Sequence, residues 1–572
     1  MNLNIKAQQA NTYDAIVVGS GISGGWAAKE LTQKGLKVLL LDRGEDIEHV
    51  SGYKTAMTNP WEFPHRGRPT VQTAEEQAVQ ARTGYTISES SAYLFVNDKD
   101  NPYLEDKRFD WMRGYHKGGR SLMWGRQVYR WSDLDFEANA KEGIAIDWPI
   151  RYKDVQPWYD YVERFIGVSG AKENLPHLPD SIFQPAMDMY CLEKHIKGSV
   201  EKKWPERRWT IGRVAHLTKP TAEQTALGRA SCQYRNLCVR GCPYGAYFSS
   251  QAATLPVAQK TGRLTFRPYS FVTSLIYDEK KQKATGVRVI DEKTSQELTF
   301  NARIIFLCAS SMASTYIMLN STSNRFPNGL GNDSGELGHN IMDHHFRVGA
   351  SGEYPGFEDQ YYYGRRANGV YVPRYRNLPG QQKRDYLRGF GYQGSASRMN
   401  WGRGYGMEGF GADFKEQLTK PGPWTMGLTG FGECLPYHEN KVVLDSSKKD
   451  KWGQPVLRFD AEYKDNEMRM RKDMGTDAAE MLEAAGLKNV RINDAGSWPG
   501  LGIHEMGTAR MGNDPKTSVL NKFNQVHTVK NVFNTDGACM TSANCVNPSL
   551  TYMALTARAA NYAVQEMKKQ NL

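Results

Sequence analysis

A glycine-rich turn between a strand and a helix, close to the start of the chain, is the feature that most constrains the fold. A short apolar run of β type, residues 13–18, leads straight into Gly19-Ser20-Gly21-Ile22-Ser23-Gly24, and a helical stretch then continues to Lys34. A second apolar run occupies residues 37–41. This order of strand, turn, helix and strand predicts a βαβ unit, and therefore an α/β fold of the Rossmann type.

The same turn predicts a dinucleotide site. Gly19 and Gly21 allow a tight turn and close approach of the backbone to a pyrophosphate, and Gly24 allows close packing of helix on strand. The helix N-terminus offers free N–H groups to the phosphate charge. Asp42 ends the second strand roughly 20 residues after the turn, where a carboxylate usually binds the ribose, and Arg43 follows it. These residues do not separate FAD from NAD, because both ligands present an ADP half.

Three cysteines in one short loop form the second informative feature. Cys232, Cys238 and Cys242 follow the spacing Cys-x5-Cys-x3-Cys-Pro, in a loop with a glycine and a proline for tight chain reversal. Three thiolates without a nearby fourth fit an iron–sulfur cluster better than zinc, which usually takes four closed ligands. The spacing alone fits equally a disulfide plus a spare thiol, or three unrelated cysteines, because it is not a common ferredoxin spacing.

Size and charge limit the remaining classes of protein. At 572 residues the chain exceeds the size of a single growing core, so we expect two domains or one large interrupted domain. The net charge of +11 is spread without a long basic run, so nucleic acid is not an expected partner, and solvated faces, an anionic partner or a membrane surface explain the charge as well. The most apolar window, residues 304–319, is interrupted by serines and a threonine and predicts a buried strand running into a helix. Residues 1–10 lack the apolar core of a signal peptide, so we expect no export signal on this chain.

Further motifs accompany the N-terminal turn. Residues 114–125 contain the double glycine Gly118-Gly119, and two more motifs lie near the C-terminus, at residues 531–537 and 547–551. Together they resemble the glucose-methanol-choline (GMC) oxidoreductase family, whose members bind FAD through segments from both ends of the chain. The resemblance implies a discontinuous Rossmann-like FAD-binding domain with an inserted α+β substrate-binding domain.

Domain boundaries follow from the same resemblance. We expect the FAD-binding domain to consist of residues 1–146, 231–340 and 491–572, with the cysteine loop at 231–243, and the substrate-binding domain of residues 147–230 and 341–490. Aromatic residues gather in the second of these domains, at 361–364 and 401–406. Aromatic faces stack on sugar C–H surfaces, so these segments suit a carbohydrate pocket, although an aromatic loop that simply packs fits the pattern equally.

The resemblance also implies roles for single residues. His504 would take the hydroxyl proton, since an imidazole titrates near neutral pH, and Asn547 would hold the same hydroxyl, since an amide both donates and accepts. Some relatives attach the flavin covalently to a histidine where this chain has Met123, so non-covalent FAD is expected. The residues implied in cofactor binding are Gly19, Gly21, Gly24, Asp42, Arg43, Gly118, Gly119, Ser121, Val272, Asp536, Asn547, Pro548 and Thr551.

The cysteine run resembles the loop of a bacterial subgroup of this family, the catalytic subunits of FAD-dependent glucose, glucoside, gluconate-type and fructose dehydrogenases. In that subgroup the loop holds a 3Fe-4S cluster and electrons pass to a cytochrome subunit. The resemblance implies oxidation of a sugar or glycoside secondary alcohol by an enzyme of the glucoside 3-dehydrogenase type. It also implies a small companion subunit and a c-type cytochrome or quinone as acceptor, with membrane contact only through partners. A signal-bearing companion would export the enzyme to the periplasm; a cytoplasmic location is the alternative.

Three other functions fit parts of the pattern. An oxygen-using pyranose or C-glycoside 3-oxidase would not need the cluster. A GMC-type lyase that cleaves cyanohydrins would not need redox turnover, and the complete set of three cysteines argues against it. A non-enzymatic electron-transfer subunit is disfavoured by the pair of His504 and Asn547.

Overall fold

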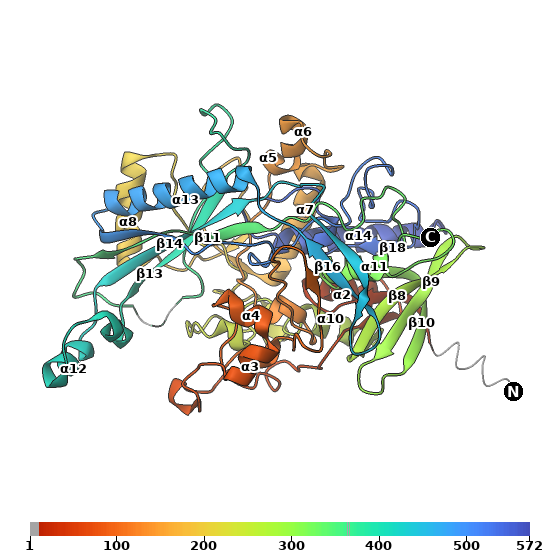
Figure 1. Ribbon diagram of the computed structural model, residues 1–572, viewed down its shortest axis with the longest axis horizontal. Coiled ribbons are helices and arrows are strands. Elements are labelled where there is room, and N and C mark those ends of the chain that lie inside the picture. Colours follow the sequence, from red (N-terminus) through yellow and green to blue (C-terminus); the bar gives the residue numbers. More distant parts are fainter. Residues whose placement is uncertain (1–10, 363, 365) are drawn as a thin grey trace.

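The computed structural model (Figure 1) describes residues 11–362, 364 and 366–572. The expectation about a signal peptide concerns residues 1–10, and the aromatic segment 361–364 includes Tyr363, so both reach outside the described residues. Within the described part of the chain, no helix is both long and apolar enough to span a bilayer.

A seven-stranded sheet forms around the N-terminal unit and confirms the predicted α/β fold. Its order is β7-β2-β1-β10-β9-β8, and β18 pairs with β10. Pairing is parallel from β7 to β10 and between β10 and β18, whereas β8 and β9 are antiparallel. The strands are β1 (Thr12–Val18), β2 (Val38–Leu41), β7 (Leu264–Arg267), β8 (Ser270–Asp278), β9 (Lys283–Asp291), β10 (Glu297–Leu307) and β18 (Val532–Asn534). The central strands bury continuous apolar runs, as a sheet covered on both faces requires.

Helices from both ends of the chain cover this sheet. The predicted helix after the glycine turn is α2 (Ile22–Gln33), and both α10 (Thr254–Lys260) and α14 (Ser549–Lys568) pack against it. The last helix of the chain therefore lies beside the N-terminal unit (Figure 1). The prediction of a strand running into a helix within 304–319 is also confirmed, because α11 (Ser311–Leu319) follows β10 closely.

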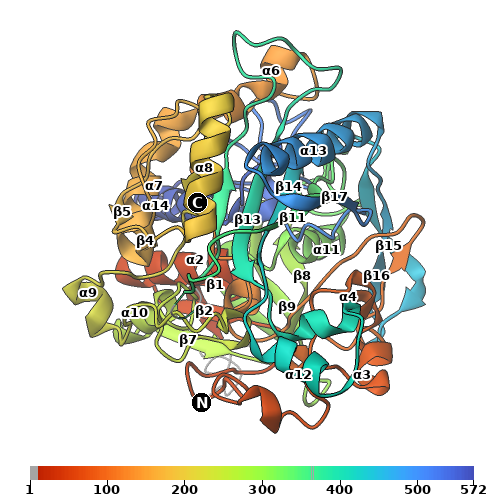
Figure 2. The same ribbon diagram turned by 90° about the vertical axis from the view of Figure 1, so that its left-hand side faces the viewer.

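A second, six-stranded sheet is antiparallel throughout, in the order β17-β11-β14-β13-β12-β6. Two helices, α8 (Cys191–Lys203) and α13 (Asp465–Ala484), cover one of its faces (Figure 2). Burial alternates along β14, which is typical of a strand with one face on a core. The strands are β6 (Thr210–Ile211), β11 (His344–Tyr354), β12 (Val370–Val372), β13 (Phe390–Arg398), β14 (Trp424–Glu433) and β17 (Lys488–Asp494).

The two sheets together confirm an α/β domain joined to an α+β domain. The predicted domain boundaries stay a prediction; β17 pairs with the second sheet as far as Asp494, although the expected boundary lies at residue 491. The remaining elements are η1 (Pro60–Glu62), α3 (Val71–Glu76), α4 (Ala78–Thr83), η2 (Ala92–Leu94), β3 (Leu104–Glu105), η3 (Gly119–Leu122), α5 (Asp133–Phe136), α6 (Ala138–Glu142), α7 (Tyr152–Ile166), β4 (Val168–Ser169), β5 (Phe183–Gln184), α9 (Ala222–Ala226), η4 (Cys238–Arg240), η5 (Trp401–Gly406), α12 (Gly411–Thr419), β15 (Lys441–Lys449), β16 (Pro455–Asp460) and η6 (Gly537–Cys539).

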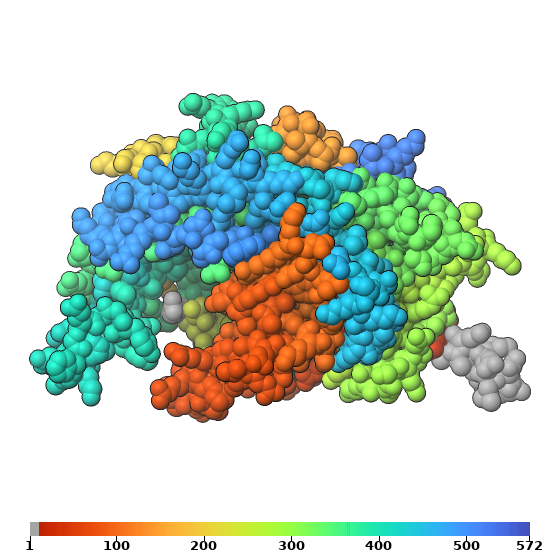
Figure 3. Space-filling view, in the orientation of Figure 1, coloured from red at the N-terminus to blue at the C-terminus, as the bar shows by residue number. Residues whose placement is uncertain are grey.

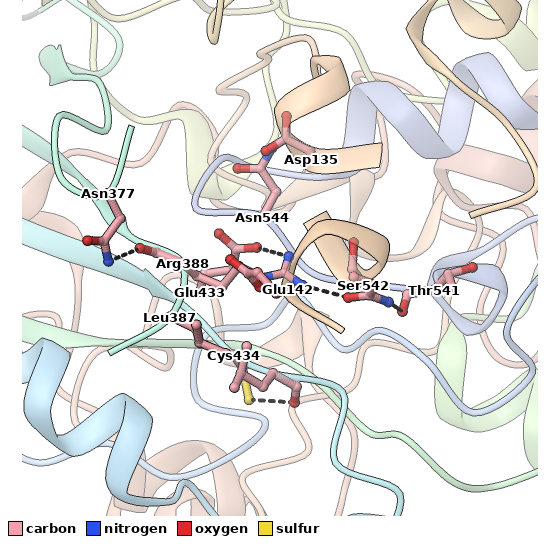
Figure 4. A network of polar contacts seen from close by, with 12 residues as sticks. Asp135, Glu142, Asn377, Leu387, Arg388, Glu433, Cys434, Thr541, Ser542 and Asn544 are labelled. Carbon is pink, nitrogen blue, oxygen red and sulfur yellow. Dashed lines mark hydrogen bonds and ion pairs between the residues drawn. The ribbon is translucent and has the colours of Figure 1, made fainter. Parts of the chain in front are cut away.

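A buried polar network ties the second sheet to the segment that precedes Asn547 (Figure 4). The guanidinium of Arg388 lies 2.9 Å from the Glu433 carboxylate and 2.5 Å from that of Glu142, and it also donates to the Asn139 side chain. Asn139 in turn donates to the carbonyl of Thr541 at 3.1 Å. A buried guanidinium needs such partners, because an unpaired buried charge is strongly destabilising. The network therefore holds the C-terminal segment against the second sheet.

Candidate active site

A cavity of about 390 Å³ runs along the glycine turn. Its walls come from segments that are far apart in sequence, including the end of β2, the double-glycine turn, the start of β8 and the last part of the chain. Ten of the predicted site residues line it: Gly19, Gly21, Asp42, Arg43, Gly119, Ser121, Val272, His504, Asp536 and Asn547. Gly24, Gly118, Pro548 and Thr551 are not among the lining residues.

The glycine turn has the geometry of a phosphate site. Gly19 has φ +92°, and a Cβ there would lie 2.5 Å from the Cys308 carbonyl oxygen. A Cβ on Gly24 would lie 1.7 Å from the carbonyl oxygen of Gly19, so this glycine serves the packing of α2 on the turn, as predicted. No side chain caps α2, so its first N–H groups remain available to an anion.

Asp42 connects the two glycine turns. Its carboxylate accepts from the backbone N–H of Ser20 at 2.6 Å and from the Ser20 hydroxyl at 2.5 Å. The same hydroxyl accepts from the Gly118 N–H at 2.8 Å. Burial raises the pKa of Asp42 to about 7. The predicted ribose-binding carboxylate therefore also fixes the shape of the turn, a role that the sequence did not indicate.

Arg43 and Val272 lie at the end of the cavity near β8. The Arg43 guanidinium stacks on the Phe271 ring, 3.7 Å from its centroid, and pairs with Glu292 at 2.8 Å. A planar guanidinium held in this way presents a flat surface on which an adenine can stack. Both residues line the cavity, and their contacts with a bound cofactor stay a prediction.

The double-glycine turn and the C-terminal segment close the middle of the cavity. A Cβ on Gly118 would lie 2.0 Å from the Gln251 side chain, so this position needs glycine. A Cβ on Gly119 would lie 3.6 Å from the Gly21 Cα atom, so the two glycine turns lie next to each other. Asp536 accepts from the Ser314 hydroxyl at 2.5 Å, and burial raises its pKa to about 6. Facing glycine turns, an uncapped helix and buried carboxylates fit the pyrophosphate and hydroxyl groups of FAD.

Of the predicted residues near the C-terminus, Asp536 and Asn547 line the cavity, whereas Pro548 and Thr551 do not. Pro548 is the N-cap of α14, and the Thr551 hydroxyl contacts the Tyr159 hydroxyl at 2.8 Å in the core. Pro548 and Thr551 therefore position Asn547 by starting the helix after it.

The predicted catalytic pair meets on the cavity wall. The Nε2 atom of His504 lies 3.4 Å from the Asn547 Nδ2 atom. Its Nδ1 atom lies 2.8 Å from the Nδ1 atom of His344, which begins β11. Burial lowers the pKa of His504 well below its ordinary value, and the neighbouring His344 and Arg120 lower it further. His504 is therefore an uncharged imidazole near neutral pH, as a base must be.

The backbone around His504 is held by a single carboxylate. Asp343 accepts from the N–H of Gly502 at 2.8 Å and from the N–H of His504 at 3.0 Å. Ile503, between these two donors, has φ +61°. The Asp343 carboxylate therefore stabilises a left-handed residue that turns His504 toward the cavity. On the other side, Glu505 pairs with Arg120 at 2.7 Å.

Amide side chains extend from Asn547 toward the second sheet. Gln393 of β13 donates to the Asn547 Oδ1 atom at 2.7 Å, and Gln127 donates to the Gln393 Oε1 atom at 2.7 Å. The Tyr129 hydroxyl donates to the Gln127 Oε1 atom. The sequence did not indicate these residues. Nor did it indicate a role for His344.

The cysteine loop, residues 231–243, lies beside the double-glycine turn, since η4 packs against η3 and Val239 lines the cavity. Cys232, Cys238 and Cys242 are free thiols. Burial raises the pKa of the Cys232 thiol to about 11, and the other two cysteines add to this shift, so the three lie within electrostatic range. The Cys238 sulfur is 3.7 Å from the Nε2 atom of His216. Within the described ranges, no group of three or more such side chains is arranged around a single metal ion.

The aromatic segment 401–406 does not line the cavity, although its composition suits a carbohydrate pocket. Trp401 and Tyr405 are 71% and 88% exposed, and none of residues 401–406 is among those lining the cavity. Together with α12 they stand away from the body of the molecule (Figure 3). The aromatic rings at the cavity come instead from the FAD-binding domain, among them Trp111 and Trp124. Composition could not show that the chain carries this segment outward.

Comparison with known proteins agrees with this architecture. Two family patterns, each described as GMC oxidoreductase, match residues 13–346 and 436–556. A 2-methyl-1,2-propanediol dehydrogenase of Mycolicibacterium austroafricanum is 28% identical, covering 97% of this chain and 95% of the relative. The fructose dehydrogenase large subunit of Gluconobacter japonicus is 24% identical, covering 97% and 98%. A 6'''-hydroxyparomomycin C oxidase of Streptomyces lividus is 23% identical, covering 96% and 90%.

The fold is also that of solved structures. A formate oxidase variant of Aspergillus oryzae RIB40 superposes with a TM-score of 0.61 at 14% identity, covering 98% of this chain and 99% of the other. The chain therefore belongs to the GMC oxidoreductases, flavoenzymes that bind FAD and oxidise alcohols.

Proposed function

We propose that this flavoenzyme is a sugar dehydrogenase of the glucoside 3-dehydrogenase type, which oxidises a secondary alcohol of a sugar or glycoside to a ketone. The observation that carries the proposal is the pair of His504 and Asn547 on the cavity wall, with the amides of Gln127 and Gln393 next to it. Amides both donate and accept, so this wall suits a substrate with several hydroxyl groups. A fructose dehydrogenase large subunit among the relatives supports a sugar.

The residues on this wall divide the work of alcohol oxidation. The substrate hydroxyl gives its proton to the Nε2 atom of His504, which burial keeps uncharged. Asn547 holds the same hydroxyl and so orients the carbon that bears it. FAD, when bound, would supply the hydride acceptor for that carbon. Met123, where some relatives attach the flavin through a histidine, lines the cavity, so we propose that FAD is bound without a covalent link.

Substrate tests decide between a sugar and a simple diol. The flavin-loaded protein is mixed without oxygen with methyl β-glucoside, with D-fructose and with 2-methyl-1,2-propanediol, and bleaching of the flavin is followed. The glycoside should bleach it fastest, and the product should be the 3-keto sugar. Faster reduction by the propanediol than by either sugar would contradict the proposal.

For the electron exit, the proposal includes a 3Fe-4S cluster on Cys232, Cys238 and Cys242. The support is that three free thiols occupy one loop, and that this loop packs against the double-glycine turn. The cluster, when bound, supplies a one-electron carrier. Assembly would have to bring the three sulfurs into place, as metal binding often completes local folding. Purified protein should contain iron and sulfide near a three-to-four ratio; full dye-linked turnover by iron-free protein would refute the cluster.

Partners and location belong to the same proposal. A companion subunit and a c-type cytochrome or quinone would receive the electrons, in the periplasm; the name of the relative, a large subunit, supports the companion. Cell fractionation tests it, because deletion of the companion gene should leave this protein in the cytoplasm.

A second candidate, a sugar oxidase that uses oxygen, is favoured by the relative that is a 6'''-hydroxyparomomycin C oxidase. Measurement of peroxide separates this oxidase from the dehydrogenase, because an oxidase consumes oxygen and forms peroxide as fast as it reduces dyes.

A further inference from the structure

His504 has a second hydrogen-bond partner, the buried His344 of the six-stranded sheet, and the proposed reaction does not use it. His344 is fully buried at the start of β11, and its ring meets that of His504 at 78° with 4.8 Å between the centroids. We infer that His344 is a positioning residue that fixes the tautomer of His504 so that Nε2 carries the lone pair. The inference deepens the proposed function and rests on the role proposed there for His504.

The contact between His344 and Asn544 determines which histidine donates in the hydrogen bond between His344 and His504. The Nε2 atom of His344 contacts the backbone carbonyl oxygen of Asn544. A carbonyl oxygen only accepts, so this nitrogen must carry a hydrogen. Burial lowers the pKa of His344 to about 4, so the ring is neutral near pH 7 and its other nitrogen, Nδ1, has a lone pair.

That lone pair decides the state of His504. The two Nδ1 atoms are 2.8 Å apart, so one must donate to the other. Because the Nδ1 atom of His344 can only accept, His504 donates from Nδ1. A neutral imidazole carries one ring hydrogen, so the His504 Nε2 atom is left unprotonated, and this is the nitrogen nearest Asn547.

The hydrogen bonds on the Asn547 side of His504 indicate the same tautomer. Gln127 donates to Gln393, and Gln393 donates to the Asn547 Oδ1 atom, so Asn547 presents its NH₂ group to His504. That group can donate only to an unprotonated Nε2, at 3.4 Å. Both ends therefore require the same tautomer. This 3.4 Å contact is also the longest in this series of hydrogen bonds. A substrate hydroxyl that enters between His504 and Asn547 therefore replaces a weak bond.

The neighbour of His344 offers a matched control. His345 is equally buried, but its ring packs on Tyr463, with 5.7 Å between the centroids. Replacing His345 removes a buried imidazole from the same strand without removing the partner of His504. A purely structural contribution of His344 should be reproduced by the His345 variant, whereas an effect on the tautomer should not.

The test uses the FAD-loaded protein with ¹⁵N-labelled histidine rings. In the wild type, the His504 signals, assigned by their loss in His504→Gln, should show a protonated Nδ1 and an unprotonated Nε2. His344→Leu should give the other tautomer or a mixture. His344→Gln should restore the wild-type state, because its amide can donate to Asn544 and accept from His504. His345→Leu should leave the His504 signals unchanged. A wild-type His504 with a protonated Nε2 overturns the inference, whatever the variants do.

Activity separates this inference from the function on which it rests. His344→Leu should slow flavin reduction by methyl β-glucoside about 10- to 100-fold, the usual effect of losing an orienting partner, and His344→Gln should recover most of the rate. If the tautomer changes in His344→Leu but the reduction rate does not, His504 is not the base and the proposed function fails. If the rate falls while the tautomer stays, His344 acts in some other way and the inference fails.

Discussion

The wall that carries His504 and the loop that carries Cys238 differ in how far the polypeptide alone completes them. On the wall, His504 is held through its backbone by Asp343 and through its ring by His344, and its partner Asn547 is held by Gln393. In the cysteine loop, by contrast, the three thiols are half-buried, and the Cys238 sulfur lies 3.7 Å from the Nε2 atom of His216.

The difference follows from the proposed roles of the two regions, which are proton transfer for the wall and electron transfer for the cysteine loop. Proton transfer needs a lone pair on a stated atom, and side chains alone can supply and fix it. Electron transfer needs a redox group that amino acids do not provide, so the loop can supply only ligands. Under the proposed function, the wall is complete when the chain folds, whereas the loop is complete only when a cluster binds to it.

Removing the base gives the largest expected effect. His504→Ala should slow flavin reduction by sugar about 10²- to 10⁴-fold, the range for a lost general base, while FAD stays bound. Stopped-flow absorbance measures the rate, and the visible spectrum reports the flavin. His438→Ala is the control, because that imidazole is exposed and pairs with Glu336. An unchanged rate in His504→Ala across neutral pH would make His504 a structural residue.

Breaking the cysteine loop should affect a different step. Cys238→Ser should abolish the iron content and slow transfer to cytochrome c at least ~10-fold, because a hydroxyl is a poor ligand for iron–sulfur clusters, while flavin reduction by sugar stays the same. Cys191→Ser is the control, since Cys191 is also a free, half-buried thiol but lies on α8. Equal loss of flavin reduction in Cys238→Ser would erase the distinction between the two regions.

Local patterns made the fold predictable. Glycines at fixed positions after an apolar run define the strand, turn and helix of β1 and α2, and the serines within 304–319 mark the end of β10. These signals are contained in a few consecutive residues, so no knowledge of tertiary structure is needed to use them.

The partners of His504 and Asn547 were not predictable in this way. His344 and Gln393 come from β11 and β13, strands of the second sheet whose sequence alternation says which face is buried but not which strand end meets the cavity. For the aromatic segment 401–406, composition suited a sugar pocket, but the structure places none of its residues on the cavity. Only the tertiary structure shows that Trp401 and Tyr405 are exposed and do not line the cavity.

Cluster assembly should depend on pH more steeply than FAD binding does. Burial raises the pKa of the Cys232 thiol to about 11, so at neutral pH it is protonated and must lose its proton to bind iron. Reconstitution of iron-free protein with ferrous iron and sulfide should therefore be several-fold faster at pH 8.5 than at pH 7. Absorbance of the cluster follows the rate, and FAD rebinding at the same two values is the control. A rate independent of pH would show that Cys232 is not a ligand.

The smallest expected effect is on stability, at the wall. The folded state lowers the pKa of His344 to about 4, below the value near 6.5 of an unfolded chain, so the unfolded state binds the proton first as the pH falls. This contribution is fully present above pH 6.5 and is lost between pH 6.5 and about 4. From pH 7.5 to 5.5 the loss should be about 1 kcal/mol of unfolding free energy. Urea unfolding of the wild type and His344→Gln at both values measures it, because glutamine does not titrate and the variant should lose less by that amount. An equal loss in both proteins would mean that folding does not lower the pKa of His344, which would contradict a buried, neutral imidazole at this position.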